Sequence, residues 1–282
     1  MTKRKFIIII SILLLIIALN IAMFGFVFRL KNQQVKYIDE VEAVNKSEII
    51  GVANLKRNSS IFLIDKEKAI KNVESKFPDL KVIQIKTTGI QTIQFIIRAR
   101  HETYYIETFS SFYILDEEMK VLKIIDKRDN PDYDASKLVK LTSNEIEITA
   151  STNVCNFVGT KTQQKLYEGV YNSVINVAIK EENGEKVYFE REDFLNSIKE
   201  IDYEKFNSYN KIIIHTTDGV KLDIENPNKD IEEKINICFA TINKFKTEDS
   251  NKPAEQQRFK TGTIKIYYDL ENKCRTIYTD NA

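Results

Sequence analysis

The chain is poor in the residues that bind metals or build disulfide frameworks. Its 282 residues include 3 cysteines and 2 histidines, His101 and His215. The odd number of cysteines leaves at least one unpaired, and the spacing of Cys155, Cys238 and Cys274 is far from a C-x-x-C motif. We therefore expect no metal, no cofactor and no disulfide framework. Cys238 falls on the apolar side of a predicted helix, so we expect a buried free thiol there.

An excess of charge of one sign is also missing. The 42 lysine and arginine residues balance 41 aspartate and glutamate residues, which leaves a formal net charge of +1. Because phosphate binding needs clustered positive charge, this balance argues against a nucleic-acid partner. No internal repeat is visible, and 43% hydrophobic residues are enough for a real core, which argues against disorder.

One long apolar run, from Phe6 to Phe28, follows a basic cluster of Lys3, Arg4 and Lys5. As a helix it would extend roughly 35 Å, which is enough to cross a ~30 Å hydrocarbon layer. We therefore expect a transmembrane helix over 6–28 and a single-pass protein of the cell membrane, with a cytoplasmic tail (1–5) and an extracytoplasmic C-terminus. The alternative is a cleaved signal peptide, but the bulky residues at the end of the run do not suit a cleavage site.

The next part of the chain predicts a small module over 35–101. A strand is expected over 35–44, a short helix after Asn45, and a second helix capped by Asp65. Two alternating strands follow, over 80–86 and 90–99. The predicted order is strand, helix, helix, strand, strand.

A larger mixed β domain with amphipathic helices is predicted over 103–268, followed by a C-terminal strand and tail over 269–282. The whole chain therefore belongs to the α+β class. The expected elements are hairpins over 113–124 and 212–224, helices over 162–179 and from Asn228 onward, a loop over 246–257, and last strands over 263–268 and 275–278.

Two short motifs are shared with penicillin-binding enzymes. Ser208 and Lys211 match S-x-x-K, and Lys260-Thr261-Gly262 matches K-T-G. The match is poor, because Ser208 runs directly into the predicted strand at Ile212 and no S-x-N lies between the two motifs. We do not expect an active serine here.

Other candidate catalytic groups also lack the partners that catalysis needs. Neither histidine has a recognisable serine or cysteine partner, and both are interpreted as surface or packing residues. The carboxylates Asp116, Glu117 and Glu118 lie in a predicted hairpin turn without an EF-hand pattern, so they are expected to be solvated. We therefore expect no enzyme and no small-molecule substrate.

Several ordered stretches resemble the FtsQ/DivIB family of bacterial cell-division proteins. Residues 35–99 are similar to its POTRA module, and 112–116 and 197–202 to parts of its β domain. Residues 213–220 and 233–235 are similar to a strand and a helix near its C-terminus. The resemblance is one of fold rather than of a site.

The chain also departs from the family pattern. The family often has Gly-Asn after its first POTRA strand, where this chain has Val44-Asn45. The family's basic-Phe-Pro turn between the two POTRA strands is replaced here by Thr88-Gly89-Ile90. The family's Glu-Arg-x-Pro segment after these strands is replaced by Arg98-Ala99-Arg100-His101. No single motif is therefore diagnostic of the family.

The resemblance implies a non-enzymatic divisome scaffold that helps coordinate septum formation at the division septum. Its implied partners are bitopic division proteins of the FtsL and FtsB/DivIC type, bound by strand addition. The alternative is an exported, membrane-anchored sensor or a sporulation-type morphogenesis protein with the same architecture. The segment implied to bind a partner contains Thr263, Ile264, Lys265, Ile266, Tyr267, Tyr268 and Asp269. The competing interpretation is that this strand is already paired internally.

Overall fold

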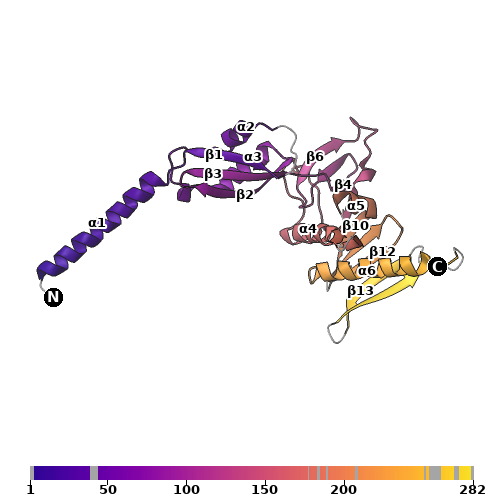
Figure 1. Cartoon of the computed structure of the whole chain (residues 1–282). Helices are drawn as coiled ribbons and strands as arrows, with labels where there is room; N and C mark the ends of the chain where they lie inside the picture. The colour runs from indigo at the N-terminus through magenta and orange to yellow at the C-terminus, as the bar shows by residue number, and fades with distance from the viewer. Residues whose placement is uncertain are drawn as a thin grey trace. The chain divides into compact units, whose positions relative to one another are not determined.

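The chain folds into two compact units, Met1–Arg100 and His101–Ala282. The structure is a computed structural model that describes residues 3–38, 44–176, 178–182, 185–188, 190–206, 209–250, 252–253, 262–269 and 273–280. Within these ranges, the side chains of 3–9, 22–26, 178–182, 185–188, 250 and 280 are not described. Figure 1 shows the elements of both units.

Helix α1 (Lys3–Val27) covers most of the apolar run. Over the residues that the structure describes, no helix has both the length and the apolar character needed to span a membrane. This finding contradicts the transmembrane helix predicted over 6–28, and the single-pass location that depended on it is corrected with it.

The first unit contains a three-stranded sheet with two helices. In chain order its elements are β1 (Asn32–Tyr37), α2 (Lys46–Ala53), the short η1 (Ile61–Leu63), α3 (Lys66–Lys76), β2 (Leu80–Gly89) and β3 (Thr92–Ala99). This is the expected order of strand, helix, helix, strand, strand. The sheet order is β1-β3-β2, with β1 parallel and β2 antiparallel to β3. Strand β1 begins at Asn32, before the predicted start at 35. Positions 39–43 of the predicted strand (35–44) lie outside the described residues.

Local sequence explains where the helices of this unit begin. The Asn45 side chain accepts a hydrogen bond from Ser47 N (3.0 Å) at the start of α2. At the start of α3, Asp65 Oδ1 accepts one from Lys68 N (2.9 Å). Each cap satisfies an amide that the helix itself leaves unpaired. Apolar residues of both helices, including Ile49 and Val73, then pack on the sheet residues that form the core of the unit.

The second unit is built on a nine-stranded sheet. Its order is β14-β13-β12-β11-β10-β7-β4-β5-β6, so β14 and β6 are the two outer strands. The strands of this sheet are β4 (Tyr104–Glu107), β5 (Ser111–Leu115), β6 (Val121–Asp126), β7 (Val139–Ser143), β10 (Ile198–Lys205), β11 (Asn210–Thr216), β12 (Lys221–Glu225), β13 (Gly262–Tyr268) and β14 (Cys274–Asp280). A separate hairpin pairs β8 (Ala178–Glu182) with β9 (Glu185–Tyr188).

Three helices, α4 (Lys161–Ile175), α5 (Arg191–Ser197) and α6 (Ile231–Ser250), pack on the sheet, and η2 (Ala135–Lys137) precedes β7. Helices α4 and α6 lie next to each other (Figure 1). Their apolar residues join those of the strands in one core. A capping box between Thr160 and Gln163 fixes the start of α4. Helix α6 is longer than expected, because it extends to Ser250 through part of the predicted loop over 246–257.

Candidate functional site

The segment expected to bind a partner lies inside the sheet. Strand β13 pairs in parallel with β12 and antiparallel with β14. Ile264 and Ile266 are fully buried, whereas Lys265 on the opposite face forms an ion pair with Glu225 (2.8 Å). The alternative that this strand is internally paired is therefore correct, and the outer strand at this end is β14. Partner binding by Thr263, Ile264, Lys265, Ile266, Tyr267, Tyr268 and Asp269 remains a prediction.

Asp269 joins the end of β13 to the start of β14 through hydrogen bonds. Its backbone N donates to Lys273 O (3.0 Å), and its Oδ1 accepts from Lys273 N (2.8 Å). Its Oδ2 accepts from Arg275 Nε (2.9 Å). These bonds fix the register of β14 on β13, in which Lys265 stands opposite Ile277.

The backbone of β14 presents alternate residues to an open side. Because Asp269 and Lys273 form a hydrogen-bonded pair, the alternation of an antiparallel ladder makes Lys265 and Ile277 such a pair as well. The backbone groups of Arg275 and Ile277 therefore point toward β13. Thr276 lies between these two residues, so its backbone N–H and C=O point away from β13. Among the described strands, β13 is the sole partner of β14.

Most side chains of β14 are exposed. Ile277 is 48% exposed, and Thr276 and Thr279 are exposed as well. Tyr278 is half-buried against Phe245 of α6, with ring centroids 5.1 Å apart. Its ring also lies directly over Gly262, where a Cβ atom would overlap it. The glycine therefore permits Tyr278 to attach the outer strand to the core.

A buried lysine joins the start of α6 to the neighbouring strands. Lys234 is 0% exposed, and its Nζ donates to Glu225 O (2.7 Å) and Asn226 O (2.8 Å). The ammonium also lies 4.9 Å from the centroid of the Tyr268 ring, and the Tyr268 hydroxyl donates to Asp230 (2.7 Å). Burial lowers the pKa of Lys234. Sequence reasoning missed this role, although position 234 adjoins the apolar stripe that predicted the helix.

The opposite outer strand, β6, is partly covered. Val121 N donates to Asn156 O (2.8 Å), and Cys155 N donates to Val121 O (2.8 Å). A bridge between Lys120 and Phe157 continues this contact. The segment 155–157 therefore occupies the outer side of β6 where the strand begins.

The carboxylates in the turn before β6 are not solvated, which corrects the prediction for Asp116 and Glu117. Asp116 is fully buried and Glu117 is 3% exposed. Asp116 Oδ1 accepts from Glu118 N (2.9 Å) and Lys120 N (2.8 Å), while Met119 adopts a positive φ of 68°. The side chain thus supplies an acceptor for two amides of a tight turn, which explains its burial without a bound cation.

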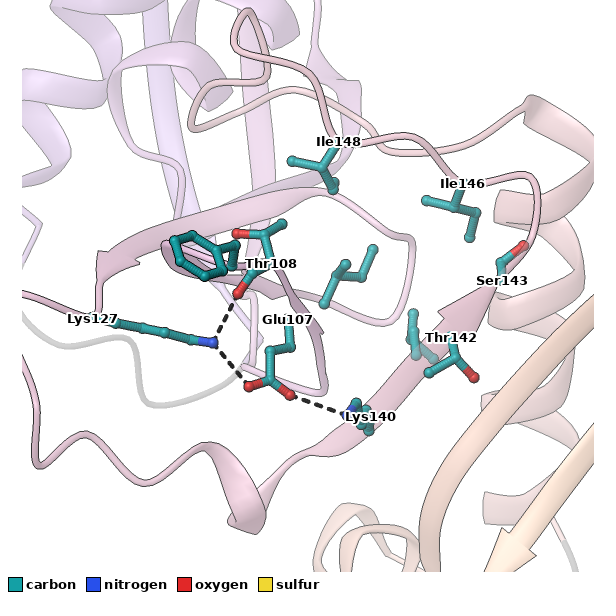
Figure 2. Close-up of a pocket in the computed structure, with 11 residues that line it drawn as sticks. Glu107, Thr108, Lys127, Lys140, Thr142, Ser143, Ile146 and Ile148 are labelled. Carbon is teal, nitrogen blue, oxygen red and sulfur yellow. Dashed lines mark hydrogen bonds and ion pairs between the residues drawn. The ribbon is translucent and has the colours of Figure 1, made fainter.

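A groove opens between β4 and β7 (Figure 2). Glu107 lies at its edge and accepts hydrogen bonds from Lys127 Nζ (2.9 Å) and Lys140 Nζ (3.1 Å). These bonds lower the pKa of Glu107, and the bond to Glu107 raises the pKa of Lys140. Ile146 and Ile148 approach from the loop after β7. The groove therefore has a mixed polar and apolar lining with a charged cluster at its edge.

The enzyme motifs are not assembled into a site by the described residues. Ser208, Lys260 and Thr261 are not among the residues that the structure describes. Lys211, the other residue of the S-x-x-K match, forms an ion pair with Glu204 (2.8 Å). His215 lies on β11, where burial lowers its pKa.

Across the described part of the chain, neither histidine ring hydrogen-bonds to a serine or cysteine. The same residues contain no cluster of three His, Cys, Asp or Glu side chains able to hold a metal ion. Cys155, Cys238 and Cys274 form no disulfide, and Cys238 is buried as predicted.

Comparison with known proteins gives no assignment, because the chain matches no family model and no curated protein.

Proposed function

We propose that this protein is a non-enzymatic scaffold of cell division that binds other division proteins by strand addition at the C-terminal end of its sheet. The observation that carries the proposal is the outer position of β14, which pairs on one side with β13. An outer strand offers backbone donors and acceptors to an extended partner, while alternate side chains supply specificity.

The composition of β14 supports this role. Its central residues Thr276, Ile277, Tyr278 and Thr279 are uncharged and have high β propensity. Protected outer strands usually carry charges, proline or a covering segment, as β6 does at its start. The strand is also held firmly from within, since Tyr278 packs on Phe245. A firmly held strand loses little conformational freedom when a partner binds.

The choice of partner rests on the resemblance described above. The order of elements in the first unit and the large sheet of the second are compatible with the architecture of FtsQ/DivIB proteins. The proposed partners are therefore bitopic division proteins of the FtsL and FtsB/DivIC type. Their bound segment is expected to be extended, because it continues a β ladder.

A proline substitution tests the backbone contribution. Thr276→Pro removes an outward-directed N–H and leaves the hydrogen bonds between β13 and β14 in place, so partner capture in a co-purification assay should fall strongly. Thr276→Val keeps the N–H and serves as the matched control. Ile277→Pro removes an inward-directed N–H and should instead destabilise the strand itself. Unchanged capture by a folded Thr276→Pro protein would overturn strand addition at β14.

The cellular role has a separate test. A fluorescent fusion of the full chain should gather at mid-cell in dividing cells. A signal confined to developing spores would refute the division role even if β14 binds a partner.

A further inference from the structure

Three short segments are held together at one end of the first unit. Ile61 N donates to Phe28 O (2.9 Å), and Lys31 N donates to Gln91 O (3.0 Å). The Gln91 side chain also donates to Val27 O (3.0 Å). The pairing of β1, β2 and β3 brings positions 32, 89 and 92 together at the same place. We call this the loop end of the unit, and it consists of residues 27–31, 56–63 and 89–92.

Large apolar side chains at the loop end are exposed to solvent. Leu63 is 84% exposed, Phe62 62% and Ile90 59%. The Phe62 ring lies beside that of Phe28, with centroids 5.2 Å apart, so the apolar patch continues to the residues that follow α1. A single exposed apolar side chain is ordinary, whereas several that two loops bring to one end of a unit indicate an interaction surface.

The charged residues of the loop end are all basic. Lys31, Lys56 and Arg57 are exposed, Arg29 is half-buried, and the three segments contain no aspartate or glutamate. Along the chain, the next charged residues after Leu63 are two acidic and two basic side chains at 65–68, which balance one another. The loop end therefore has a local excess of positive charge, although the whole chain is close to neutral.

This combination fits the surface of an anionic lipid bilayer. Exposed apolar side chains enter the boundary between headgroups and acyl chains, and basic residues beside them are attracted to the negative headgroups. A protein partner would need a preformed hollow that matches the projecting side chains of two loops. A fluid lipid surface accommodates them without such a match.

We propose that the loop end of the first unit docks on the surface of an anionic lipid bilayer, with Leu63, Phe62 and Ile90 inserted at the level of the headgroups and Lys56 and Arg57 on the lipid phosphates. The contact involves one face of the bilayer and needs no helix that crosses it. The inference does not depend on strand addition at β14 or on the proposed role in cell division.

A single tryptophan reports this contact locally, because the chain contains none. The probe is the full chain carrying Leu63→Trp, mixed with vesicles of phosphatidylcholine and phosphatidylglycerol in equal amounts, with brominated acyl chains. We expect strong quenching of the tryptophan fluorescence and a shift of its emission to shorter wavelength. Ile83→Trp, at an exposed position on β2 outside the loop end, is the matched control and should not be quenched. A local readout is needed because α1 is apolar as well.

A charge variant tests the basic residues. Lys56→Gln combined with Arg57→Gln, in the Leu63→Trp background, should lower insertion about thirtyfold, because each basic residue near an anionic surface contributes about fivefold. Lys71→Gln combined with Lys76→Gln removes the same charge at two exposed positions of α3 outside the loop end. This matched control should leave the quenching unchanged.

The apolar contribution and the lipid charge are tested separately. Ile90→Ser in the Leu63→Trp background should lower insertion about fivefold through loss of apolar contact. Vesicles of phosphatidylcholine alone should quench the tryptophan only weakly. Raising the salt concentration should weaken the quenching by anionic vesicles, because mobile ions screen the basic residues.

The proposal has clear contrary outcomes. It is overturned if Leu63→Trp is quenched no more than Ile83→Trp, or if neutral vesicles quench it as strongly as anionic ones. Concentration-dependent sedimentation without lipid that is abolished by Leu63→Ser would show that a second copy covers the loop end, and would also overturn it. None of these outcomes alters partner capture at β14, so failure here and failure of the proposed function are distinguishable.

Discussion

The two ends of the large sheet treat their outer strands differently. At the β6 end, the segment 155–157 hydrogen-bonds to Val121. The strand ends at the charged residue Asp126, which is followed by Lys127 and Arg128. At the β14 end, a largely exposed strand with uncharged central residues (276–279) pairs with β13 alone among the described strands. Covered or charged outer strands resist further pairing, whereas open ones invite it. The contrast indicates that pairing is blocked at one end and available at the other.

The largest expected effect concerns the turn that leads into the covered end. Asp116→Ala removes the acceptor of two backbone amides, at Glu118 and Lys120, and should lower the free energy of unfolding by about 3 kcal/mol. Asp116→Asn retains one acceptor oxygen and should cost about 1 kcal/mol. Urea denaturation followed by circular dichroism measures both. An Asp116→Ala protein as stable as the wild type would show that the turn does not depend on this side chain.

The next largest loss of stability is expected where Tyr278 attaches β14 to the rest of the sheet. Gly262→Ala places a Cβ atom against the Tyr278 ring, which must move away from Phe245, and we expect a loss of about 2 kcal/mol. The same substitution in a Tyr278→Ala background should cost well under 1 kcal/mol, because the overlap is gone. Equal losses in the two backgrounds, measured by urea denaturation, would contradict the proposed role of the glycine.

A smaller effect is expected from the charged cluster beside the groove. The pKa of Glu107 is lowered in the folded protein by hydrogen bonds from Lys127 and Lys140. Its stabilising contribution is therefore present above the ordinary pKa of glutamate and is lost as the pH falls through the lowered folded value. Because the side chain is 38% exposed, screening by solvent keeps the contribution to about 0.5 kcal/mol.

Comparing the unfolding free energies of wild type and Glu107→Gln between about pH 6 and about pH 3 measures this term. The difference between the two proteins should shrink toward the acid end. A difference that stays constant with pH would show that Glu107 titrates normally.

The sequence predicts elements well where the periodicity is undisturbed. The hairpin β11–β12 joins an apolar run to an alternating strand through Asp218-Gly219, and α6 repeats apolar residues at helical spacing, so both were predicted. Strand β10 was missed because a bulge between Ile198 and Glu200 breaks its period of two. Strands β4 and β7 were missed because each is only 4 or 5 residues long.

The site was harder to predict because it depends on contacts between distant parts of the chain. The open strand was expected at 263–269, but the parallel pairing of β13 with β12 and its pairing with β14 place β14 outermost. Likewise, the sequence around Asp116 predicts a turn but not its burial. Which strand lies outermost is a property of the sheet order, and local alternation does not encode that order.

A matched pair of isoleucines gives the finest test of the difference between the two ends. Ile277 on β14 is 48% exposed and Ile124 on β6 is 36% exposed, so replacing either with serine should cost only about 0.5 kcal/mol of stability. Capture of a division partner in the co-purification assay should nevertheless separate them, because described residues cover β6 at its start and none of them pairs with the outer side of β14. Ile277→Ser should reduce capture and Ile124→Ser should leave it unchanged. If both variants lose capture equally, the partner does not distinguish the two ends, and the open strand cannot be the reason for binding.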